Sequence, residues 1–153
     1  MTSLVKTIAM TIAVGVTVWA ADPFVGTWKL NPERSKLMAG QRAEPSTMVC
    51  EVAEGGYRFT SSNPSILPAV FRLDGKTYAV PENARFAQGL GADEWSSRRL
   101  SVNAIEATYF RARKPVGTIR REISSDGRTF TSTHDGIRPS GEKVAYTNAF
   151  DRQ

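Results

Sequence analysis

Short segments in which apolar and polar side chains alternate follow one another from residue 22 to the end of the chain. In the first of them, Phe24, Trp28 and Leu30 fall on one face, and polar residues fall on the other. Gly55-Gly56 and Asp126-Gly127 separate later segments of the same kind. A period of two is typical of strands with one buried face, and Asp-Gly between such segments is a strong hairpin signal.

Eight to ten of these segments occur at even spacing, joined in chain order by short turns. One of the turns is Asp74-Gly75, which we predict to join the strands at 69–73 and 77–80 in a hairpin. The pattern predicts an all-β fold, a single up-and-down antiparallel β-barrel of 8–10 strands.

One short N-terminal helix is predicted over residues 31–38. Asn31 can cap it, Pro32 suits its first position because the missing N–H would be unpaired there, and Gly40 limits its length.

Residues 81–94 show no periodicity and are predicted to form a rim loop. Two interpretations stay open for it, a mobile lid whose exposed Phe86 and Leu90 contact a ligand or a membrane, and a plain surface loop.

The first twenty residues have the pattern of a cleaved secretory signal. A short start with one cation, Lys6, precedes an uncharged run over 7–18, and a small residue, Ala20, stands at the expected cleavage point. We therefore expect a signal peptide at 1–20 and one domain at 21–153, secreted or periplasmic. A retained N-terminal anchor is the alternative.

Composition narrows the classes of function. Cys50 is the single cysteine, so no intrachain disulfide can form, and its place in an alternating segment predicts a buried, inert thiol. The formal charge is +5, but no basic run carries interleaved aromatic residues, so we expect no nucleic-acid partner. We expect a monomer, with peripheral contact to the envelope as a further interaction to consider.

A barrel of about eight strands is either filled by side chains or holds one small ligand. The inward positions mix large residues with the small residues Ala69, Ala107 and Ser132, which favours a partial cavity for a small hydrophobic or amphipathic ligand. The predicted lining residues are Phe71, Tyr78, Tyr109, Ile119, Arg121, Phe130, Asn148 and Phe150. The alternative is a filled barrel, a structural or interaction protein of the cell envelope that acts through its rim loops.

Arg121 is the predicted polar anchor of this interior. Strict alternation places it on the same face as Ile119 and Ile123, which should point inward. A buried guanidinium needs a partner. An inward acid or water would satisfy it, and so would the carboxylate or phosphate of a ligand.

The segment 24–30 resembles the first strand of lipocalins and of intracellular fatty-acid-binding proteins. In lipocalins the Gly-x-Trp tryptophan plugs the closed end of the barrel, and an arginine near the last strand stacks on it. The resemblance implies this structural role for Trp28 and Arg152.

The segment 118–128 is similar to the Arg-Glu-…-Asp-Gly-Lys hairpin of fatty-acid-binding proteins, whose arginine helps to bind a carboxylate. The resemblance implies that role for Arg121. The family's closing Arg-x-Tyr is not kept, because Asn148 and Phe150 stand there.

A third resemblance, to small secreted bacterial proteins of lipocalin-like (calycin-type) appearance, covers nearly all of the chain after the leader. It lies in the segments 26–36, 74–78, 105–108 and 126–129. This family carries no assigned function, so the resemblance implies a fold and an exported location only.

His134 is the single histidine and the one candidate for chemistry. It is interpreted either as a haem or metal ligand, or as a rim histidine bonded to Asp135 or solvent. No second histidine or cysteine cluster accompanies it, and no Gly-x-Ser-x-Gly nucleophile motif occurs. We therefore predict a protein that is not an enzyme and needs no metal or cofactor.

Overall fold

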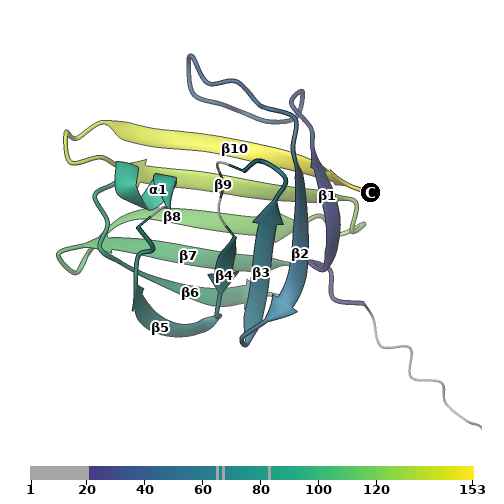
Figure 1. Ribbon diagram of the computed structural model, residues 1–153, viewed down its shortest axis with the longest axis horizontal. Coiled ribbons are helices and arrows are strands. Elements are labelled where there is room, and N and C mark those ends of the chain that lie inside the picture. Colours follow the sequence, from purple (N-terminus) through teal and green to yellow (C-terminus); the bar gives the residue numbers. More distant parts are fainter. Residues whose placement is uncertain (1–20, 65, 67, 83) are drawn as a thin grey trace, which may run out of the picture.

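Ten antiparallel strands form one curled sheet in the computed structural model, which describes residues 21–153 except 65, 67 and 83 (Figure 1). The strands are β1 (Gly26–Leu30), β2 (Thr47–Ala53), β3 (Gly56–Ser61), β4 (Ala69–Phe71), β5 (Asp74–Ala79), β6 (Glu94–Ser101), β7 (Ala104–Arg111), β8 (Lys114–Ile123), β9 (Thr129–Ile137) and β10 (Lys143–Arg152). The all-β, up-and-down prediction is confirmed.

The strand order is β4-β3-β2-β1-β10-β9-β8-β7-β6-β5, so the first and last strands pair in the middle of the sheet. The edge strands β4 and β5 do not pair with each other. Side chains cross this opening. Phe71 of β4 packs edge-on against Trp95 of β6, with 5.3 Å between ring centroids, and Arg99 of β6 donates a 2.6 Å hydrogen bond to the Tyr57 hydroxyl of β3.

Two predicted hairpins are present and one is not. The β2–β3 hairpin turns at Glu54-Gly55, both with positive φ, and the β8–β9 hairpin turns around Asp126-Gly127. The prediction of a hairpin at Asp74-Gly75 was wrong. Asp74 begins β5, and Leu73 and Gly75 have positive φ. Around these residues the chain passes from β4 at one edge of the sheet to β5 at the other edge, and the two strands do not form a hairpin.

The prediction of a helix over 31–38 was wrong, because this segment forms a hydrogen-bonded turn over residues 32–34 and no helix. Asn31 does accept a cap-like hydrogen bond from the Arg34 N–H at 3.2 Å, but the chain then leaves the turn. Lys36 exchanges two backbone hydrogen bonds, of 2.8 and 2.7 Å, with Thr147 of β10. The segment therefore pairs with the neighbouring strand β10 at Lys36 and does not continue into a helix.

The described helix, α1 (Arg85–Gly89), lies in the segment predicted as a rim loop, at the end of the sheet away from the C-terminus (Figure 1). Leu90 directly after it is 1% exposed, so its predicted exposure was wrong. The Leu90 methyl groups fill the space that a Cβ at Gly117 or Gly136 would occupy, so Leu90 packs directly on these two glycines. Among the described helical residues, none belongs to a helix long and apolar enough to cross a membrane.

The opposite end of the barrel is sealed around Trp28, which is fully buried. Its indole N–H donates to the Phe24 carbonyl at 3.0 Å, its ring lies 5.5 Å from that of Phe130, and Arg152 stacks over it at 4.1 Å. The Arg152 guanidinium also donates to the carbonyls of residues 23, 25 and 127. The Arg152 side chain on the last strand thus links that strand to the start of the domain and to the β8–β9 turn.

Candidate functional site

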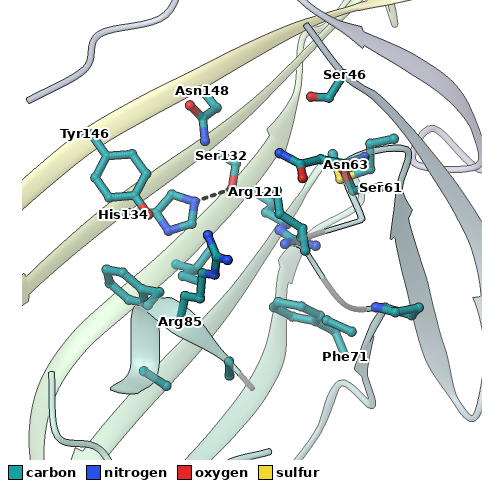
Figure 2. A pocket seen from close by; sticks show the side chains of 18 of the residues that line it. Ser46, Ser61, Asn63, Phe71, Arg85, Arg121, Ser132, His134, Tyr146 and Asn148 are labelled. Atoms are coloured by element: carbon teal, nitrogen blue, oxygen red, sulfur yellow. Dashed lines mark hydrogen bonds between the residues drawn. The ribbon is translucent and has the colours of Figure 1, made fainter. Parts of the chain in front are cut away.

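A cavity of about 830 Å³ lies inside the curl of the sheet (Figure 2). It is lined by residues of the β1–β2 connection, the β3–β4 connection and α1, and by the inner faces of the strands. Apolar walls come from residues that include Met48, Ala69, Phe71, Trp95, Tyr109, Ile119 and Phe150. The interior is therefore open, which does not favour the filled-barrel alternative.

The structure brings most of the predicted binding residues to this cavity. Those that line it are Phe71, Tyr78, Tyr109, Ile119, Arg121, Asn148 and Phe150. Phe130 does not line it, because the Phe59 and Phe150 rings stack on it at 6.0 and 5.4 Å and place it in the core of the sealed end. Trp28 and Arg152 also lie at that end, away from the cavity.

Sequence reasoning placed Ser132 inward only as a small residue, and it missed His134, Tyr146 and Arg85 on the polar side of the cavity. Ser132, His134 and Tyr146 line it, together with Arg85, which projects into it from α1 (Figure 2). The signal was available for β9, because alternation places Ser132 and His134 on the same face as the buried Phe130.

Three adjacent strands set the order of these side chains. One rung of the sheet pairs Arg121 of β8 with Ser132 of β9, and Ser132 with Asn148 of β10. The next rung toward α1 pairs Ile119 with His134 and His134 with Tyr146. Directly opposed residues on one face lie about 5 Å apart at Cβ. The cation and the neutral polar groups are therefore immediate neighbours.

Arg121 is buried at 9% exposure and reaches across the barrel to aromatic rings of β3 and β4. Its guanidinium carbon lies 3.9 Å from the Phe59 ring centroid and 4.3 Å from that of Phe71. Nε and Nη1 have no hydrogen-bond partner, and within the described chain no carboxylate pairs with the side chain. Burial lowers the pKa of Arg121 to about 10, so it stays charged at neutral pH.

His134 is buried beside this cation and is not the rim residue that one interpretation predicted. Its Nε2 lies 3.0 Å from Ser132 Oγ, not near Asp135, and its Nδ1 is buried without a partner. Tyr146 stacks on the imidazole at 4.4 Å, and Phe86 of α1 packs perpendicular to it at 5.0 Å.

Burial, reinforced by the charge of Arg121, lowers the pKa of His134 to about 3, so the ring is neutral at pH 7. The residues described here contain no group of three or more histidine, cysteine or acidic side chains that could hold a metal ion.

This lowered pKa predicts acid sensitivity. Below pH 6.5 the unfolded chain takes up a proton on His134, while the folded protein does so only near pH 3, so stability falls as pH falls between these values. We expect His134 to account for a loss of about 2 kcal/mol of unfolding free energy between pH 7 and pH 5. Urea denaturation at both pH values measures it. An equally large loss in His134→Phe would contradict the assignment.

Comparison with known proteins supports the fold. No protein-family model and no curated protein matches the chain. Among solved structures, the zebrafish ileal bile acid-binding protein in complex with cholic acid matches with a TM-score of 0.56 and 12% identity, over 86% of this chain and 99% of that one. The chain therefore has the calycin-type fold of the fatty-acid- and bile-acid-binding proteins.

Proposed function

We propose that this protein is an exported carrier or receptor for a small amphipathic anion, held inside the barrel with its acidic group at Arg121. The observation that carries the proposal is the buried Arg121 guanidinium, which lines the cavity and has no acidic partner within the described chain. A desolvated cation without a partner is unfavourable, and a bound carboxylate or phosphate would supply the missing charge and acceptors.

The rest of the cavity fits this class of ligand. Its apolar walls suit a hydrocarbon body, as in ligand pockets generally. The lining includes Arg42 and Arg85, besides Arg72, which is paired with Glu54 at 2.6 Å, while Glu44 is the one acid among the described lining residues. This imbalance favours the approach of an anion. The similar fold of the zebrafish bile acid-binding protein, whose structure contains cholic acid, supports a small amphipathic ligand for this barrel.

The location outside the cytoplasm rests on the leader, residues 1–20, which lie outside the described part of the chain. Asp22 accepts a 2.5 Å hydrogen bond from the Tyr57 hydroxyl and a 3.0 Å bond from the Phe24 N–H. This early anchoring is what we expect of a domain that starts at residue 21. Detection of the processed chain in a periplasmic or culture fraction would test it.

A competition assay tests the binding function. Displacement of the fluorescent probe 1-anilinonaphthalene-8-sulfonate from the purified protein would be measured with hexadecanoate and with hexadecanol, which share a chain but differ in charge. We expect the acid to bind at least tenfold more tightly, because only the acid pairs with Arg121. Equal affinities would remove the anionic preference. Absence of any binding would overturn the proposed function as a whole.

A further inference from the structure

Four polar side chains of β9 and β10 line the cavity without any role in pairing the Arg121 charge. This polar wall consists of Ser132, His134, Tyr146 and Asn148, and it occupies the two rungs of the sheet at and next to Arg121 (Figure 2). Apart from the Ser132–His134 contact, the wall has open hydrogen-bonding capacity. His134 Nδ1 is buried without a partner, and the described chain offers no hydrogen bond to the Tyr146 hydroxyl or the Asn148 amide.

A plain hydrocarbon chain cannot satisfy the hydrogen-bonding groups of this polar wall. An alkyl group laid against it would exclude water from the Tyr146 and Asn148 groups and leave His134 Nδ1 unsatisfied, since CH₂ neither donates nor accepts. A ligand oxygen at the same place would satisfy at least one of these groups. Sites built to bond a polar group discriminate against analogues that lack it for this reason.

His134 is the member of the wall best placed to recognise such an oxygen. Tyr146 and Phe86 hold its ring from two directions, and Ser132 occupies Nε2, which leaves Nδ1 as the free position. Because the ring is neutral, it adds no second charge and can act as donor or acceptor, according to its tautomer.

We propose that His134 is a specificity-determining residue that hydrogen-bonds a hydroxyl group of the ligand, so that this protein selects hydroxylated amphipathic acids over the corresponding unsubstituted acids. The proposal rests on the proposed function, since it assumes that an acid occupies the cavity with its charge at Arg121. It specifies the chemical class of that acid and names the residue that recognises its hydroxyl group.

Matched acids test the selection. Dissociation constants would be measured for hexadecanoate against 3-hydroxyhexadecanoate, and for octadecanoate against 12-hydroxyoctadecanoate. We expect at least one hydroxylated acid to bind about tenfold more tightly than its parent. In His134→Phe, which keeps an aromatic ring against Tyr146, this advantage should vanish while the parent acids still bind. His134→Asn, which offers an amide near the position of Nδ1, should restore part of it.

Asp135→Asn is the matched control, because Asp135 is the exposed neighbour on β9 and should leave the selectivity unchanged. Parent and hydroxylated acids binding equally well would overturn the inference and leave the proposed function standing. Failure of all four acids to bind would remove the proposed function, and this inference with it. An advantage that survives in His134→Phe would overturn the role of His134.

Nitrogen-15 NMR provides a readout that needs no variant. The chain contains one histidine, so tag-free protein labelled at histidine gives a single imidazole pair. We expect the Nδ1 resonance to shift when the preferred hydroxylated acid binds and to move much less with its parent. Equal shifts with both acids would contradict a hydrogen bond to the hydroxyl.

Discussion

Arg121→Met is expected to weaken the binding of hexadecanoate at least thirtyfold and to raise the stability of the ligand-free protein. The affinity falls because removing one partner of a buried charge pair costs about 2 kcal/mol or more. The stability rises because the buried guanidinium has unpartnered Nε and Nη1 atoms, and methionine removes this desolvation burden. The stacking on Phe59 and Phe71 offsets part of the gain, so we expect about 1 kcal/mol.

Titration calorimetry and urea denaturation of the same samples measure the two effects. Arg120→Gln is the matched control. Arg120 is the next residue on β8 but points outward to an exposed ion pair with Glu122, so both quantities should stay near those of the parent protein. A destabilised Arg121→Met that binds normally would show that Arg121 is a structural residue, and would contradict its role as the anion site.

Trp28→Ala is expected to lower the free energy of unfolding by about 3–5 kcal/mol. The indole is fully buried, packs on Phe130, and lies beneath the Arg152 guanidinium. Its loss leaves a large cavity in the sealed end and removes the surface on which Arg152 stacks. Urea denaturation monitored by far-ultraviolet circular dichroism measures the change.

Lys29→Ala on the same strand is the control, because its exposed side chain should contribute less than about 0.5 kcal/mol. Trp28 does not line the cavity. At temperatures where Trp28→Ala remains folded, its preference for hexadecanoate over hexadecanol should therefore match that of the parent protein. A large change in that preference without loss of stability would mean that the two ends of the barrel are not separate in function.

The inward direction of Arg121 followed from the sequence because it needs only local alternation. Ile119 and Ile123 on the same face fix it, and β8 keeps that register without interruption to its end at Ile123. The same rule placed Ser132 inward on β9, and one step further along the strand it would have brought His134 to the cavity wall. The interpretation of His134 as a rim residue failed because Asp135, its neighbour in sequence, points to the other face of the strand.

The errors concern segments whose structure depends on distant partners. Asn31 and Pro32 are good helix-starting residues, yet Lys36 pairs with Thr147, more than a hundred positions along the chain. Asp74-Gly75 carries a hairpin signal, yet it forms the start of β5, and the preceding strand β4 lies at the opposite edge of the sheet. Leu90 lies in an aperiodic segment, and only the space above Gly117 and Gly136 explains its burial.

The sequence by itself determined the all-β class, the meander of short strands and the inward direction of the residues at Trp28 and Arg121, because a strand's side chains alternate whatever lies across from it. Only the tertiary structure decided that the interior is open at about 830 Å³, that Arg121 has no acidic partner within the described chain, and that His134 stands beside it. These properties depend on which side chains meet across the barrel, and that is set by register and closure between strands far apart in the chain.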